Sequence, residues 1–292
     1  MDPSWITAEV ARLLPVDMDK SLPPVDPRTA DWPLLGEIWQ PLSIAGAYLA
    51  MVFIGPKLMA PFKPFQLRVT LVIYNLFLTL LSLYMCVEFV LSVIDGGLNW
   101  GCSAVDYAPT AAATRLARVC WVYYVSKVVE FFDTLFFILR KKQEQISFLH
   151  VYHHVTMFIW WWLVTKRYAG GSVYFGAMMN SGVHVIMYFY YMLAAFGPAV
   201  RPYLWWKKYL TSIQMMQFLI VIGHNHYVAY SDCGFSVPLA YCLTAYMWSL
   251  FALFYDFYRK SYRRTSKERP DGSHAVSASQ NGASNGAGKK HQ

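Results

Sequence analysis

Charged side chains are scarce in this sequence: Asp, Glu, Lys and Arg supply 14% of the 292 residues, whereas 56% are hydrophobic and 17% are aromatic. This balance lies outside ordinary soluble domains and is typical of polytopic membrane proteins. Acidic residues are also fewer than basic ones, 17 against 25, but the basic residues stand in short clusters between apolar runs. Such a distribution argues against nucleic acid as a partner and indicates a membrane topology.

The first 34 residues lack the basic segment and following apolar segment of a cleavable signal peptide, and are instead acidic and rich in proline. We therefore expect a tail over residues 1–34, followed by a membrane domain over residues 35–262. Seven stretches of about 20 mainly apolar residues predict transmembrane helices in that domain. They cover residues 36–55, 67–94, 117–139, 148–165, 172–195, 205–228 and 237–258. The expected fold class is an all-α polytopic membrane protein with seven transmembrane helices.

Basic side chains are distributed unequally between the two sides of these spans. Seventeen Lys and Arg residues follow the first, third and fifth spans or lie in the C-terminal tail, whereas seven lie on the other side. The positive-inside rule therefore predicts a lumenal N-terminus and a cytosolic C-terminus. Residues 263–292 are rich in Ser, Gly, Asn and Ala, which predicts a disordered tail. Lys289 and Lys290 near its end look like the dilysine retrieval signal of endoplasmic-reticulum membrane proteins, and a chance basic ending is the alternative.

Three histidines, His150, His153 and His154, lie within five residues of the fourth span. Positions i, i+3 and i+4 share one face of a helix, so the three rings are expected to point the same way. Polar groups at membrane depth are costly and usually face a bundle interior or a cavity. This cluster therefore predicts a functional site, with histidines hydrogen-bonded to neighbouring helices as the alternative.

The middle of the third span carries three charged residues, Lys127, Glu130 and Asp133. At about 3 kcal/mol each they oppose insertion by roughly 9 kcal/mol, against about 4–7 kcal/mol returned by its large apolar residues. The charges must therefore find partners on neighbouring helices or in a water-filled chamber. Either a network that orients a site or a purely structural one fits this pattern.

Two further spans contribute polar side chains at helical spacing. They are Asn180, His184 and Tyr188 in the fifth span, and Gln214 and Gln217 in the sixth. At 1.5 Å per residue, the polar groups of four spans lie roughly 3–16 Å from the cytosolic helix ends. This shared depth predicts a chamber in the cytosolic half of the bundle, open to the cytosol.

Four motifs occur in the order and spacing found in the animal fatty-acid elongases, the very-long-chain 3-oxoacyl-CoA synthases. They are Lys127-x-x-Glu130-x-x-Asp133-Thr134, His150-x-x-His153-His154, Asn180-x-x-x-His184-x-x-Met187-Tyr188 and Thr211-x-x-Gln214-x-x-Gln217. The sequence resembles this family over about residues 35–262. Residues 196–210 look most like the branch that makes very long, including polyunsaturated, chains.

The resemblance implies an acyltransferase that condenses a long-chain acyl-CoA with malonyl-CoA, releasing CO2 and CoA, without a cofactor or metal. It also implies that six of the seven helices form a barrel around a narrow substrate tunnel. His153 is the expected nucleophile and His184 its closest partner, while Asn180 is expected to hydrogen-bond the thioester or enolate oxygen. His150 and His154 are expected to activate or orient the reacting groups.

Supporting roles are expected for the remaining polar residues of these motifs, namely Lys127, Glu130, Asp133, Tyr188, Gln214 and Gln217. Arg201, Lys207 and Lys208 could meet CoA phosphates at the cytosolic mouth, although they also serve as topology signals. The expected partners are the endoplasmic-reticulum membrane and the reductases and dehydratase of the elongation cycle. A homo-oligomer is also possible.

Two other classes of function remain open from the residues alone. A histidine box also occurs in membrane di-iron desaturases and hydroxylases, but these use about eight histidines in several boxes. This chain has eight in total, of which His274 and His291 lie in the tail. A carrier or channel would use the charges of the third span for transport, yet the sequence shows no inverted repeats or broken helices.

Cys102 and Cys233 fall in the two loops assigned to the lumen, after the second and the sixth span. The lumen is an oxidising compartment, so we predict a disulfide between them. Two free thiols are the alternative, because sequence does not show whether their Cα atoms lie within about 7 Å.

Overall fold

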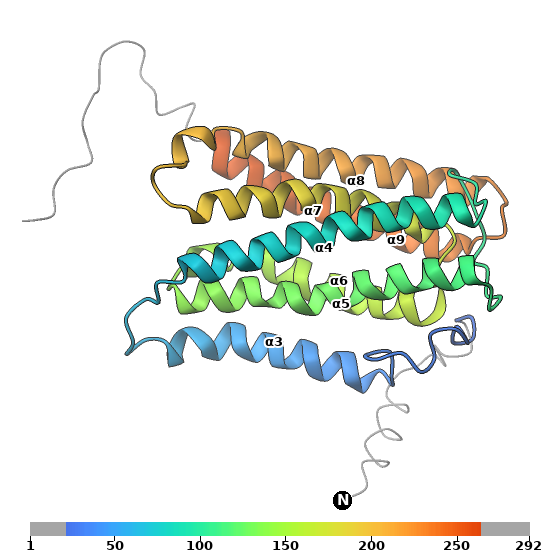
Figure 1. Ribbon diagram of the computed structural model, residues 1–292, viewed down its shortest axis with the longest axis horizontal. Coiled ribbons are helices and arrows are strands. Elements are labelled where there is room, and N and C mark those ends of the chain that lie inside the picture. Colours follow the sequence, from blue (N-terminus) through green and yellow to red (C-terminus); the bar gives the residue numbers. More distant parts are fainter. Residues whose placement is uncertain (1–21, 264–292) are drawn as a thin grey trace, which may run out of the picture.

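The computed structural model describes residues 22–263, which form seven α-helices and, within this range, no β-strand (Figure 1). The helices are α3 (Trp39–Leu58), α4 (Arg68–Asp95), α5 (Ala111–Leu139), α6 (Phe148–Arg167), α7 (Val173–Ala195), α8 (Lys207–Tyr230) and α9 (Val237–Tyr258). Short helical turns occur at Gln143–Gln145, Arg201–Tyr203 and Arg259–Arg263. Most of the predicted N-terminal tail, nearly all of the predicted C-terminal tail, and Lys289 and Lys290 lie outside the described residues.

The helices coincide closely with the seven apolar stretches of the sequence. The largest difference is at α5, which begins at Ala111 and not at residue 117. Thr110 explains the earlier start, because its side chain accepts a hydrogen bond of 3.2 Å from the backbone N–H of Ala113 and so caps the helix. Ser147 and Ser236 cap α6 and α9 in the same way.

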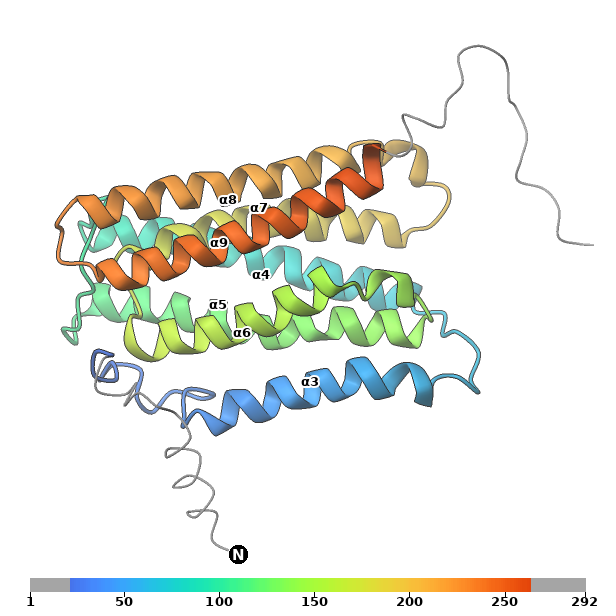
Figure 2. The same cartoon turned by 180° about the vertical axis from the view of Figure 1, so that it is seen from behind.

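Six helices pack as a closed series of neighbours, in the order α4, α5, α6, α9, α8, α7 and back to α4. Helix α3 packs outside this series against α5 and α6, and both ribbon views show it at the edge of the bundle (Figures 1 and 2). Successive helices run in opposite directions, so their ends gather at two ends of the molecule. We call them the histidine end, where α6 and α8 begin, and the disulfide end, where α7 and α9 begin.

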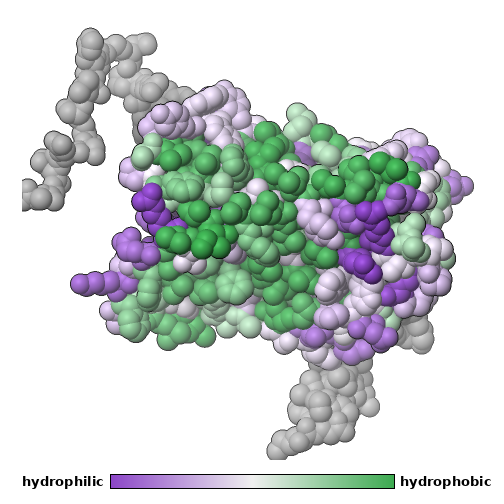
Figure 3. Space-filling model, viewed as in Figure 1, coloured by the Kyte–Doolittle hydropathy of each residue, from purple (hydrophilic) through white to green (hydrophobic). Residues whose placement is uncertain are grey.

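Apolar side chains cover much of the outer surface. Large hydrophobic residues are exposed along α3, α4 and α8, among them Phe53, Val69, Phe77, Leu80 and Met216. Figure 3 shows a broad apolar region between two more hydrophilic ends. Within the described residues, three helices are by length and composition apolar enough to cross a membrane: Trp39–Met59, Arg68–Asp95 and Val237–Ser261. The other four reach similar lengths but carry most of the buried charged, histidine and amide side chains, which lowers their mean hydropathy.

The disulfide end is tied together by covalent and polar links. Cys102 and Cys233 form a disulfide with Cα atoms 6.0 Å apart, joining the loop after α4 to the loop between α8 and α9. The segment before α3 adds Arg28, which pairs with Asp26 and donates to the carbonyl of Ala113 at 2.8 Å. These links hold the connections between helices in place at this end.

Candidate active site

Helix α6 begins immediately before the histidine cluster. Ser147 accepts a hydrogen bond of 3.2 Å from the backbone N–H of His150, which fixes that residue in the first helical turn. The ring of His154 lies one turn further on, 4.4 Å from the ring of His150, and His153 lies 5.6 Å from His154 between ring centroids. The three histidines are therefore neighbours, as the spacing predicts.

The three rings do not share the same surroundings, which corrects the expectation of a single common face. His150 Nε2 lies 2.7 Å from the hydroxyl of Thr134, and that hydroxyl lies 3.0 Å from Tyr48 OH. The ring of His154 packs against Tyr48 and Phe131, each 6.2 Å away between centroids. Successive helical residues are about 100° apart around the axis, so His153 faces different neighbours from His154.

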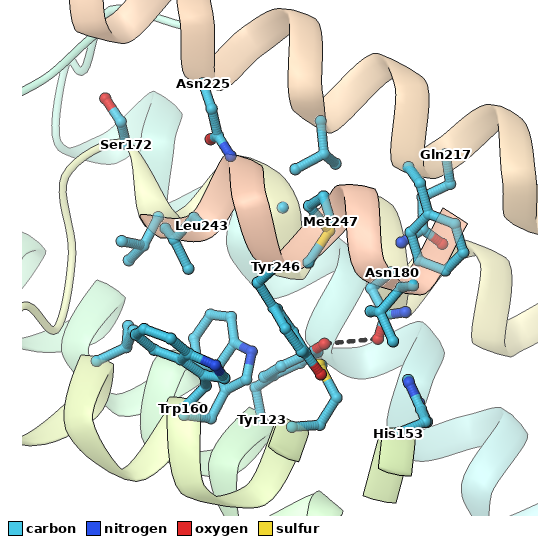
Figure 4. A pocket seen from close by; sticks show the side chains of 18 residues that line it. Tyr123, His153, Trp160, Ser172, Asn180, Gln217, Asn225, Leu243, Tyr246 and Met247 are labelled. Carbon is cyan, nitrogen blue, oxygen red and sulfur yellow. Dashed lines mark hydrogen bonds between the residues drawn. The ribbon is translucent and has the colours of Figure 1, made fainter. Parts of the chain in front are cut away.

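His153 lies at one end of a cavity enclosed by α5, α6, α7, α8 and α9 (Figure 4). The space inside it that a molecule the size of water can enter is about 50 Å³. Its walls are mainly aromatic and aliphatic, with Met157, Trp160, Trp161, Phe218, Leu243, Tyr246, Met247 and Leu250 among the lining residues. A lining of this composition suits an apolar ligand.

The cavity extends farther than the sequence predicted. It runs from His153 and Gln217 to Ser172 and Asn225, near the disulfide end, whereas we expected a chamber confined to the half nearer the histidine end. Gly176, which has no side-chain carbon, and the small residue Val221 line this additional space between the helices. The cavity is therefore an elongated space that begins at a histidine.

Asn180 and Tyr123 line the cavity close to His153 (Figure 4). The hydroxyl of Tyr123 donates a hydrogen bond of 2.5 Å to Oδ1 of Asn180. Because the carbonyl oxygen is occupied, the amide N–H₂ group of Asn180 is left as a donor for other groups. Tyr123 is not among the site residues predicted from the sequence, although it lies one helical turn before Lys127 on the charged helix.

The charged residues of α5 find partners inside the bundle, as their insertion cost requires. Lys127 Nζ lies 2.7 Å from Glu130 Oε1, and the same oxygen lies 3.6 Å from His184 Nδ1. Asp133 accepts a hydrogen bond of 3.1 Å from the hydroxyl of Tyr188. His184 is thus connected to a buried ion pair, while His153 is the histidine that lines the cavity.

Within the described residues, the atom Nδ1 of His153 is buried without a hydrogen-bond partner. Burying a nitrogen without a hydrogen-bond partner costs free energy, because no bond replaces those it made to water. Such an atom in a native structure therefore calls for an explanation, and a role in binding or reaction is one. His153 also has the most direct access of the three clustered histidines to a ligand in the cavity. These two observations single out this imidazole as the candidate reactive group.

The remaining predicted residues occupy different places. Gln217 lines the cavity, whereas Gln214 is half-buried and donates to Sδ of Met187 at 3.4 Å. Lys207 and Lys208 are exposed at the start of α8, at the histidine end. Arg201 begins the short turn that precedes α8. Of the two glutamines, Gln217 alone lines the cavity, and Lys207 and Lys208 lie at the surface.

Among residues 22–263, no group of three or more His, Cys, Asp or Glu side chains is placed to hold a metal ion. His224 lies toward the disulfide end, stacked on Phe175 with ring centroids 4.0 Å apart. It is thus separated along the helices from the histidine cluster of α6.

Fold and site together define a class: an all-helical, multi-pass membrane protein with a histidine at one end of an elongated apolar cavity. Residues 33–270 match the family described as "ELO: GNS1/SUR4 family", and the chain belongs to this family.

Similar curated proteins come from several vertebrates. The chain is 45% identical to very long chain fatty acid elongase 4 of Mus musculus, over 91% of this chain and 88% of the relative. It is 43% identical to very long chain fatty acid elongase 7 of Rattus norvegicus, over 84% and 89%. It is 44% identical to very long chain fatty acid elongase 5 of Tachysurus fulvidraco, over 92% and 91%. The family assigned from the four motifs is therefore confirmed.

Proposed function

We propose that this protein is the condensing enzyme of fatty-acid elongation. It joins a long-chain or very-long-chain acyl-CoA to malonyl-CoA and yields a 3-oxoacyl-CoA two carbons longer, with CO2 and CoA. The observation that carries this proposal is the elongated apolar cavity that begins at His153, together with membership of the elongase family. Purified protein incubated with labelled malonyl-CoA and a panel of acyl-CoAs should form labelled 3-oxoacyl-CoA. Absence of a labelled product with every acyl-CoA would contradict the proposal.

The first step of the proposed mechanism is acyl transfer to His153. A neutral imidazole nitrogen attacks the thioester carbonyl, the C–S bond breaks, and CoA leaves as the thiol after taking the imidazole proton. The acyl chain then occupies the cavity while its carbonyl is bonded to the histidine. The buried, unpaired nitrogen of His153 at the cavity's end supports this assignment.

Decarboxylation of malonyl-CoA supplies the carbon nucleophile of the second step. Loss of CO2 leaves an enolate whose carbon attacks the acyl-histidine carbonyl. The C–N bond then breaks, and the leaving imidazolate takes up a proton from the solvent, which restores the neutral His153. In this proposal the amide N–H₂ group of Asn180 donates to the developing oxyanion. The bond from Tyr123 to its carbonyl oxygen supports this role, because it leaves the amide group as the free donor. No cofactor is needed for either step.

His184 acts in this proposal as the second histidine of the site. Its Nδ1 lies 3.6 Å from Glu130, so the carboxylate can orient the ring and stabilise a positive charge on it. Lys127 completes the group by neutralising Glu130. His150 and His154 contact α3 and α5 and are assigned the role of orienting α6, and thereby His153.

The membrane arrangement that we propose has seven spanning helices, six of which enclose the acyl chain. The closed packing order of α4 to α9, with α3 outside, supports this barrel. Basic residues at the histidine end indicate the cytosol, where CoA substrates occur, and the disulfide end would then face the oxidising lumen. The proposed location is the endoplasmic-reticulum membrane.

Further partners follow from the chemistry of the product. A 3-oxoacyl group must be reduced, dehydrated and reduced again before the next round, so we expect the reductases and dehydratase of the cycle as functional partners. Lys207, Lys208 and Arg201 are the candidates for contacts with CoA phosphates at the histidine end. Association of two copies in the membrane remains a separate expectation.

A further inference from the structure

We propose that the far end of the cavity accepts acyl chains that carry a hydroxyl group on the terminal carbon. The inference rests on the proposed condensing function and adds a substrate class to it. It arises from Asn225, a polar residue of α8 that lines the otherwise mainly apolar cavity at the end opposite His153.

The side chain of Asn225 is placed to meet the end of a bound chain. Asn225 is 8% exposed, and Figure 4 shows its amide directed from α8 toward the cavity. At 1.5 Å per residue, Asn225 lies about 12 Å along α8 from Gln217, which lines the cavity near His153. A chain attached at His153 and extended through the cavity would bring its terminal carbon to this amide.

The amide nitrogen of Asn225 has no hydrogen-bond partner among the described residues. The neighbouring His224 approaches the Asn225 side chain, but no hydrogen bond reaches Nδ2. The other polar group at this end is already satisfied: Ser172 Oγ accepts from Ser103 N at 2.9 Å and donates to Ser103 O at 3.1 Å. Asn225 is therefore the polar group here that a ligand can still bond.

A terminal methyl group and a terminal hydroxyl group have opposite effects at this position. A methyl group would cover the amide and leave its N–H unbonded, which is unfavourable in a buried place. A hydroxyl oxygen can accept from Asn225 Nδ2 and thereby satisfy the donor. A site with a buried donor discriminates strongly against ligands that cannot bond it. The same condensation at His153 would then lengthen an ω-hydroxyacyl chain.

The test compares matched pairs of acyl-CoAs of increasing length, each pair with a terminal methyl or a terminal hydroxyl group. For pairs long enough to reach Asn225, the wild type should elongate the hydroxylated member at least as efficiently as the other. In Asn225→Leu, the ratio of kcat/KM for the hydroxylated over the plain chain should fall roughly ten-fold. For short pairs the ratio should be the same in both proteins, which also shows that the variant is folded.

A matched control comes from the same helix face. Val221 lies one turn before Asn225 and also lines the cavity. Val221→Leu narrows the cavity without changing its polarity, so it should affect both members of a pair equally. If the ratio of kcat/KM for the hydroxylated over the plain chain is the same in Asn225→Leu as in the wild type at every length, the proposal is overturned. It is also overturned if Val221→Leu lowers this ratio as much as Asn225→Leu does.

A binding measurement separates this inference from the condensing function. S-alkyl-CoA thioethers, plain or with a terminal hydroxyl group, cannot transfer an acyl group but can occupy the cavity. The hydroxylated thioether should raise the Tm of the wild type more than the plain one, and this difference should disappear in Asn225→Leu. Equal shifts in both proteins would overturn the subsite. Failure of every acyl-CoA to be elongated would instead overturn the condensing function alone.

Discussion

Tyr123 of α5 donates a hydrogen bond of 2.5 Å from its hydroxyl to the carbonyl oxygen of Asn180 in α7, at the wall of the cavity near His153. An asparagine amide has a donor end and an acceptor end, and this contact decides which end is left for a ligand. The cavity therefore presents an N–H₂ group where the proposed mechanism develops negative charge on oxygen.

We expect Tyr123→Phe to lower kcat by roughly 2- to 10-fold, because one hydrogen bond that orients Asn180 is lost. KM for the acyl-CoA should change little, since the aromatic ring remains in the wall. Steady-state kinetics of the purified variant measure both quantities. Tyr124→Phe is the matched control. It also removes one tyrosine hydrogen bond, the bond of 3.0 Å from the Tyr124 hydroxyl to Leu34 O, but this bond lies outside the cavity. An equal loss of kcat in both variants would contradict the assigned role.

The second prediction concerns the covalent intermediate. Wild-type protein incubated with acyl-CoA but without malonyl-CoA should release CoA and gain the mass of the acyl group. His153→Ala should show neither effect. His226→Ala is a suitable control, because His226 lies in α8 near the disulfide end, away from the histidine cluster. Its Nδ1 lies 2.8 Å from Ile222 O of the same helix. Intact-protein mass spectrometry decides the question, and an adduct that persists in His153→Ala would exclude this residue as the nucleophile.

The third prediction concerns the buried ion pair of Lys127 and Glu130. Glu130→Gln removes one charge and leaves Lys127 buried without its counterion, which should destabilise the protein by about 3–5 kcal/mol. The double variant Lys127→Met/Glu130→Gln removes both charges and should recover most of the thermal stability in detergent. Activity should stay low in both, because His184 loses its carboxylate partner. Full activity in the double variant would show that the network is purely structural.

The fourth prediction concerns the link between Cys102 and Cys233. Protein isolated without reductant should have two fewer free thiols than reduced protein, and its mobility on a denaturing gel should change on reduction. Cys102→Ser should lower the free energy of unfolding by about 2–5 kcal/mol, since the bond closes a long loop. Identical mobility and thiol counts under both conditions would disprove the bond in the isolated protein.

The fifth prediction concerns cellular location and rests on Lys289 and Lys290, outside the described residues. Replacing both with serine should let the protein leave the endoplasmic reticulum while its activity in membranes stays the same. Fluorescence microscopy of tagged wild type and variant provides the measurement. Retention of the double variant would point to a different signal.

Sequence reasoning was most successful where local patterns decide structure. The seven helices and the position of the histidine cluster follow from apolar length and from residue types alone. It was less successful for the cavity, which reaches Ser172 and Asn225 instead of ending in the half that holds the histidines. Its extent depends on how small and large side chains of five helices fit together, and no single helix carries that information.

The sequence by itself determined the family, the seven helices and the residues available for chemistry. Only the tertiary structure decided which of them meet: His153 lines the cavity, His154 packs against α3 and α5, and Tyr123 bonds Asn180. The physical reason is that helical spacing fixes the angle between two residues on one helix, about 100° per position, but not the direction in which that helix faces its neighbours. That direction is set by the packing of side chains between helices that are distant in sequence.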